Sequence, residues 1–135
     1  MKTHYEATCN GIEQAFANVQ STFETPDNDD GFIRFLFCIR EALNNVVEHS
    51  EATRFRVQTR RLKEETSELL CFRCCDNGIA FDVPVRQSTP QLSMQGRGWQ
   101  IIQAWCDGAR LKRYDNTNQL TLYKKAGNRA VPTDK

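Results

Sequence analysis

Apolar residues recur at helical spacing in two segments of the N-terminal half of this chain. Between residues 11 and 24, one face carries Ile12, Ala15, Phe16, Val19 and Phe23, which predicts an amphipathic helix. The turn-rich residues 25–30 separate it from a second helix, predicted over residues 31–49. The apolar stripe of this second helix comprises Phe32, Phe35, Leu36, Ile39, Leu43, Val46 and Val47.

The pattern then changes from helical spacing to alternation. In residues 54–62, apolar positions alternate with arginines and a glutamine, which predicts a half-buried strand. We predict further strands over residues 3–9 and 68–75, a short helix over 99–106, and a hairpin of strands 109–115 and 119–124 joined by 116–118. This order predicts an α+β fold, a two-layer α/β sandwich with a mixed, mostly antiparallel sheet covered on one face by helices.

Length and charge limit the classes of protein to consider. The 135 residues predict one domain over residues 1–125, followed by a disordered tail over 126–135. A formal net charge of +1 gives no electrostatic case for binding nucleic acid or a membrane surface. No apolar run approaches the ~20 residues of a membrane span, so we expect a cytoplasmic protein. The six cysteines are expected to be reduced and mostly buried, because the Cys71–Cys74 spacing has no second pair to complete a zinc site.

The late part of the second predicted helix carries the most informative polar residues. Glu41 and Asn45 lie one helical turn apart, on a face distinct from the apolar stripe. Asparagine is unusual inside a helix, and its carboxamide oxygen suits Mg²⁺ that is already held by phosphates. A carboxylate one turn earlier can accept a proton from a hydroxyl that attacks a terminal phosphate. Taken alone, the pair also fits an ordinary solvated helix face.

Two glycine-containing turns follow in the sequence. Asp76-Asn77-Gly78 comes directly after a predicted strand, where a carboxylate can accept the exocyclic amine of adenine and a glycine lets a flat base approach. Gly96-Arg97-Gly98 opens a predicted helix, whose N-terminal amides and dipole favour phosphate. Each turn alone also fits a solvent-exposed loop.

The three elements together resemble the N, G1 and G2 boxes of the GHKL ATPases, which share the Bergerat fold. Within that group the chain is most similar to the small bacterial anti-sigma factor serine kinases, over roughly residues 3–125. The matching strings are Glu41-Ala42-x-x-Asn45-x-x-x-His49, Asp76-x-Gly78-x-Ala80-Phe81-Asp82, and Gly96-Arg97-Gly98-x-x-Ile101-Ile102 followed by Asp107.

The resemblance implies a role for each matching residue. Asn45 would bind Mg²⁺, Glu41 would act as the catalytic base, and Asp76 would accept the adenine amine of ATP. Gly78 would lie beside the ring with Thr121 supporting it, and Gly96, Arg97 and Gly98 would border the triphosphate. Two departures bear on affinity: Ala80 replaces the usual second glycine, and the predicted lid over residues 84–95 has Arg86 as its one cation.

The implied function is a Mg·ATP-dependent protein serine/threonine kinase and anti-sigma switch. It would phosphorylate a STAS-domain anti-sigma antagonist in a bacterial partner-switching pathway and act as a homodimer, and it could also hold a sigma factor. One alternative is the catalytic ATP-binding domain of a histidine kinase, although no helical hairpin with a phosphate-accepting histidine is recognisable. Another is a non-catalytic ATP-binding anti-sigma or adaptor module, which would not require Glu41.

Overall fold

The computed structural model describes residues 3–23, 30–49, 51–65, 67–79 and 94–126. The order of elements along the chain is the predicted one. The elements are β1 (His4–Glu6), α1 (Cys9–Phe23), α2 (Asp30–His49), β2 (Arg54–Lys63), β3 (Glu68–Asp76), α3 (Met94–Trp105), β4 (Gly108–Tyr114) and β5 (Thr117–Lys125).

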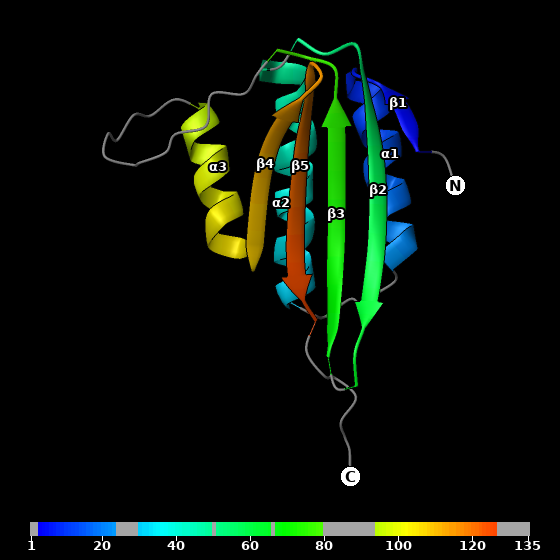
Figure 1. The fold of residues 1–135 in the computed structure, drawn as a ribbon, viewed down its shortest axis with the longest axis vertical. Coiled ribbons are helices and arrows are strands. Elements are labelled where there is room, and N and C mark those ends of the chain that lie inside the picture. The colour runs from blue at the N-terminus through cyan, green and yellow to red at the C-terminus, as the bar shows by residue number, and fades with distance from the viewer. Residues whose placement is uncertain (1–2, 24–29, 50, 66, 80–93, 127–135) are drawn as a thin grey trace.

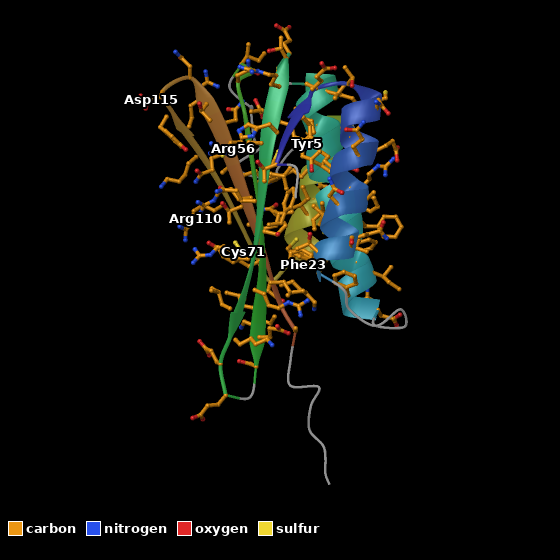
Figure 2. The ribbon with its side chains drawn as sticks, turned by 90° about the vertical axis from the view of Figure 1, so that its right-hand side faces the viewer. Tyr5, Phe23, Arg56, Cys71, Arg110 and Asp115 are labelled. Atoms are coloured by element: carbon orange, nitrogen blue, oxygen red, sulfur yellow. The ribbon has the colours of Figure 1, made fainter. Side chains whose placement is uncertain are left out.

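The strands form one sheet in the order β1-β2-β3-β5-β4. Every neighbouring pair is antiparallel, so the sheet is more uniform than the mixed, mostly antiparallel arrangement that we predicted. The helices lie on one side of the sheet, and Figure 2 shows the other side open. The predicted α+β class and its two layers are therefore confirmed.

The core lies between this sheet and the helices. Figure 2 shows Tyr5 and Phe23 in this layer, and Tyr5 stacks on Phe55 with ring centroids 5.4 Å apart. Burying such large apolar side chains is the main stabilising contribution to a fold of this kind. The largest fully buried apolar side chains are Phe23, Phe35, Phe72, Ile39, Leu43, Leu70, Ile102 and Leu122.

Local chemistry fixes the start of α1. The hydroxyl of Thr8 accepts a hydrogen bond from the amide of Gly11 at 3.0 Å, the bond expected of an N-cap threonine. A Cβ at Gly11 would lie 1.9 Å from the backbone oxygen of Glu6. Only glycine lets α1 pack so closely against the end of β1.

The β4–β5 hairpin closes with a two-residue turn. Asp115 and Asn116 have φ angles of 50° and 61°, as a type I′ turn requires. This turn is shorter than the predicted connection over residues 116–118. Our assignment of Asn118 to the turn was wrong, because β5 begins at Thr117 and the residue lies inside the strand.

The third helix also differs from its prediction. It begins at Met94 rather than near residue 99, so the glycine motif lies within its first turns. Ala80, the predicted lid up to residue 93 with its Arg86, and the predicted tail beyond residue 126 lie outside the described residues. Within the described part of the chain, no helix is both long and apolar enough to span a bilayer.

All six cysteines are free thiols. Cys38, Cys71, Cys74 and Cys75 are buried, as predicted, whereas Cys9 is exposed. Burial raises the pKa of the Cys74 thiol well above its ordinary value, with the nearby Asp76 carboxylate adding to the effect. This thiol is therefore uncharged in the folded protein at neutral pH.

Candidate nucleotide site

Three elements that carry the predicted motifs meet at one end of the molecule. Figure 1 shows the C-terminal ends of α2 and β3 and the N-terminal end of α3 at the same end, drawn uppermost. These ends hold Asn45, Asp76 and Gly96, which are far apart in the sequence. The fold thus brings the three predicted motifs to one end of the molecule.

Packing between α2 and α3 holds the two helices together. The rings of Phe37 and Trp105 meet edge to face with centroids 5.9 Å apart, and the thiol of Cys38 contacts the carbonyl oxygen of Ile101 at 3.9 Å. A hydrogen bond with Cys106 lowers the pKa of Cys38, although burial and the Glu41 carboxylate oppose this shift. These contacts fix the position of α3, and with it the glycine motif, against α2.

Glu41 and Asn45 occupy the edge of the buried face of α2. Both are half-buried, whereas Ala42 and Val46, each one residue further along, are fully buried. The buried side chains of Ala42 and Val46 pack this part of α2 against the core. The backbone that carries Glu41 and Asn45 is therefore held in place, as a metal-binding or proton-accepting pair requires.

Asp76 is the most constrained of the predicted site residues. Its side chain is only 4% exposed, on the same face of the sheet as the core. The Oδ1 atom accepts hydrogen bonds from the amide of Gly78 at 2.8 Å and from the side-chain amide of Asn118 at 3.0 Å. A carboxylate that is buried and held in this way has a fixed orientation.

Asn118 is a site residue that the sequence reasoning missed. It is 2% exposed and pairs with Asp76 across the β3–β5 ladder. Its side-chain amide also donates to the carbonyl of Ile79 at 2.6 Å, and its Oδ1 accepts from Arg113 at 3.0 Å. The signal was present in the alternation of residues 118, 120 and 122, which places Asn118 on the same face as two core leucines.

Two further contacts complete the support of the Asp76-Asn77-Gly78 turn. Arg113 donates to the carbonyl of Gly78 at 2.9 Å. The side-chain oxygen of Asn77 accepts from the amides of Thr53 and Arg54 at 2.9 and 3.1 Å. The turn is thus tied to β2 on one side and to the β4–β5 hairpin on the other.

Thr121 does not join this group, and our expectation for it was wrong. Residues that pair across an antiparallel ladder share a face, and Thr121 pairs with Arg73, whereas Asp76 pairs with Asn118. Arg73 and Asp76 are three positions apart in one strand, so they point to opposite faces. The Thr121 hydroxyl accepts from Arg73 Nε at 3.1 Å on the open side of the sheet.

The glycine motif lies in the first turns of α3. Gly96 falls within the first turn of this helix, whose amide groups have no partner inside the helix. The backbone N–H groups at this end, together with the helix dipole, suit an anionic ligand. Residues 96–98 thus lie at the N-terminal end of α3, at the same end of the molecule as the C-terminal ends of α2 and β3 (Figure 1).

These residues fit a magnesium nucleotide. The buried Asp76 can accept an amine, Asn45 supplies a neutral oxygen, and Glu41 supplies a carboxylate one turn away. Within the described residues, no cluster of three or more His, Cys, Asp and Glu forms a metal cage. A magnesium ion bound with a nucleotide would take most of its ligands from phosphate oxygens and water, and Asn45 could serve as a protein ligand.

The support of Asp76 leads to a stability prediction. Asn118→Ala removes the side-chain amide that donates to Asp76 and to the carbonyl of Ile79, and also the oxygen that accepts from Arg113. The substitution therefore leaves buried polar groups without these hydrogen bonds. We expect the free energy of unfolding to fall by about 1–3 kcal/mol. Urea denaturation followed by circular dichroism measures this change.

Asn10→Ala is the matched control, because Asn10 is exposed in the first turn of α1. We expect this control to stay within ~0.5 kcal/mol of the wild type. An Asn118→Ala protein as stable as the control would mean that Asn118 does not support the Asp76 turn.

Comparison with known protein families agrees with this geometry. Residues 5–124 match the histidine kinase-like ATPase domain family, so the chain belongs to that family. The match covers nearly all described elements, from β1 to β5. A search of curated proteins gave no match.

A solved structure shares the fold. The crystal structure of the RsbU and RsbW domains of Rv1364c from Mycobacterium tuberculosis superposes with a TM-score of 0.59 at 18% sequence identity. The similarity covers 96% of this chain and 34% of that protein, so the chain spans about a third of its length. At this identity the similarity establishes the fold.

Proposed function

We propose that this chain is a Mg·ATP-dependent protein serine/threonine kinase that acts as an anti-sigma switch. Its substrate would be a serine or threonine of a STAS-domain anti-sigma antagonist. The observation that carries this proposal is the meeting of α2, β3 and α3 at one end of the molecule, with Asp76 buried and held by Gly78 and Asn118. Membership of the histidine kinase-like ATPase family supports the nucleotide part of the proposal.

The proposed roles follow from the chemistry of each side chain. Asp76 accepts the adenine amine, and Gly78 lets the ring approach its backbone. Asn45 would hold Mg²⁺, which neutralises charge on the phosphates when bound. The backbone of residues 96–98, with Arg97 adding a positive charge, would border the triphosphate.

Glu41 is the proposed base. The hydroxyl oxygen of the partner's serine attacks the terminal phosphorus of ATP and forms a new P–O bond. Glu41 accepts the hydroxyl proton, and ADP leaves with the electron pair of the broken P–O bond. Adaptor binding alone would not require a carboxylate at this position, and this favours the kinase over the non-catalytic module.

The partners belong to the proposal as well. The solved neighbour is described as carrying RsbU and RsbW domains in one protein, which supports a partner-switching context. We propose a homodimer that engages the STAS protein beside the lid and that also holds a sigma factor. The activity would then be cytoplasmic.

Phosphate transfer tests the proposal directly. The chain is incubated with γ-labelled ATP and, separately, with each STAS protein of its host. We expect one STAS protein to be labelled, and the label to disappear when its acceptor serine or threonine is replaced with alanine. The Glu41→Gln chain is the matched enzyme control.

Two other outcomes would contradict the kinase. ATP binding without labelling of any STAS protein would favour the non-catalytic module. Acid-labile labelling of the chain itself, lost on replacement of His4 or His49, would favour histidine-kinase chemistry; these are its two histidines.

A further inference from the structure

The open face of the sheet is strongly basic. Strand alternation places Arg73 of β3 on this face, and its ladder partners Gln58 and Thr121 lie beside it. Figure 2 shows Arg56 and Arg110 pointing away from the helices on this side. Among the outward positions of the five described strands, Glu6 is the one carboxylate. The basic face is defined by its cations, which are Arg54, Arg56, Arg60, Arg73, Arg110, Lys112 and Lys125.

The arginines of the basic face lack carboxylate partners within the described residues. The cations that form ion pairs in the described part of the chain are Arg40, Arg61 and Lys124, and none of them belongs to the basic face. Arg56 Nε is buried without a hydrogen-bond partner, and its Nη2 donates to the thiol of Cys75 at 3.6 Å. Within the described residues, the arginines of this face form no ion pair, although Glu6 faces Arg54 across the β1–β2 ladder.

The basic face is hollowed at two places, and each hollow combines arginines with a tyrosine. One hollow of about 390 Å³ is lined by residues that include Arg60, Arg73, Tyr123, Gln58, Leu62 and Cys71. The other, of about 500 Å³, is lined by residues that include Arg54, Arg56, Tyr114, Cys75 and Thr117, together with the carboxylates of Asp76 and Asp115. Leu62 and Tyr114 are 42% and 44% exposed, so each hollow has an apolar border.

We propose that the basic face is a docking surface for an acidic segment of a partner protein. Arginine presents a planar fork of donors that matches a carboxylate with two parallel hydrogen bonds, and it loses less hydration than lysine on pairing. Aromatic and apolar borders around charged contacts are typical of protein interfaces. The hollow around Arg60 and Arg73 lies on the opposite side of the sheet from the proposed nucleotide site, so the inference does not depend on the kinase proposal.

Two other occupants fit the basic face less well. A second copy related by a twofold axis would place the same patch against itself, which sets like charges together. Single-stranded nucleic acid is bound on sheets by stacking bases on aromatic rings. Here the outward positions of the central strand β3 are Leu69, Cys71, Arg73 and Cys75, and the tyrosines flank it. An acidic polypeptide therefore fits the residues present best.

The test uses a fluorescein-labelled poly-L-glutamate peptide and the full chain at low salt. Fluorescence anisotropy gives the affinity, and spectra of the ¹⁵N-labelled chain locate the contact. We expect the shifted amides to belong to β2, β3, β4 and β5. The Arg60→Gln/Arg110→Gln double variant should weaken binding on the order of tenfold, as expected for the loss of two exposed charge contacts.

The matched control is Arg34→Gln, an exposed arginine on α2 in the helical layer. It should bind the peptide as the wild type does. The proposal is overturned if the control loses as much affinity as the double variant, or if the peptide fails to bind. Tighter binding of oligo-dT than of the peptide, or a change of oligomeric state in the double variant, would also overturn it, in favour of nucleic acid or a second copy.

Discussion

Replacing Asn45 with alanine is expected to abolish measurable binding of Mg·ATP. The substitution removes the one protein oxygen that we assign to the metal. We expect the affinity to fall by more than about 100-fold, beyond the ~10–100-fold that loss of a residue supporting a metal ligand typically costs. Isothermal titration calorimetry with Mg·ATP measures the change.

Asn44→Ala is the control for this experiment. Asn44 is the adjacent asparagine on α2 and is also half-buried, so the chemical change is the same one position away. The control should bind Mg·ATP as the wild type does. Chelation of magnesium with EDTA should reduce wild-type binding to the level of the Asn45→Ala chain. A loss of affinity shared equally by the two variants would remove Asn45 from the metal site.

The second large effect is expected at Glu41. Glu41→Gln keeps the shape of the side chain but cannot accept a proton. We expect Mg·ATP affinity to change little, whereas the rate of phosphate transfer to the STAS partner falls on the order of 10²–10⁴-fold, the usual range for a lost general base. Single-turnover labelling separates the rate of transfer from binding.

Glu48→Gln provides the matched control, because Glu48 is an exposed glutamate about two turns further along α2. Its rate should equal that of the wild type. If Glu41→Gln transfers phosphate at the wild-type rate, another group accepts the proton and our assignment of the base is incorrect.

The sequence predicted the long elements well because each has a clear apolar period. The helix that we predicted over residues 31–49 runs from Asp30 to His49, and the strand that we predicted over 54–62 runs from Arg54 to Lys63. In both, burial follows the apolar stripe. Periodicity sets these boundaries directly.

The start of α3 was missed for a physical reason. Glycines carry no apolar signal and have low helix propensity, so the pattern becomes visible only from Trp99 onward. In the structure the helix begins at Met94, with Gly96 and Gly98 inside its first turns. Local propensity was therefore a poor guide to this boundary.

The length of the β4–β5 turn decides whether Thr121 or Asn118 lies beside Asp76. A loop over residues 116–118 leaves the position of Asn118 relative to β3 undefined. The two-residue turn at Asp115 and Asn116 fixes the register, so that Asn118 pairs with Asp76 and Thr121 pairs with Arg73. Because side chains alternate between faces, this register decides which of the two residues can support Asp76.

The basic face of the sheet could not be predicted from the sequence either. The net charge of +1 gave no indication of a binding surface. The alternation of Arg54, Arg56 and Arg60 with apolar residues placed them on one side of a strand. Only the sheet order brings Arg73 and Arg110 onto the same face, from strands that are distant in the sequence.

The central claim, that Asp76 reads adenine in a nucleotide site at the end of α2, β3 and α3, is tested most directly by comparing nucleotides. Calorimetry is performed with Mg·ATP and Mg·GTP on the wild type and on Asp76→Asn. The wild type should prefer ATP by more than about tenfold, because guanine presents a carbonyl where adenine presents the amine that a buried carboxylate accepts. This preference should disappear in Asp76→Asn. Equal affinity of the wild type for the two nucleotides would contradict the account.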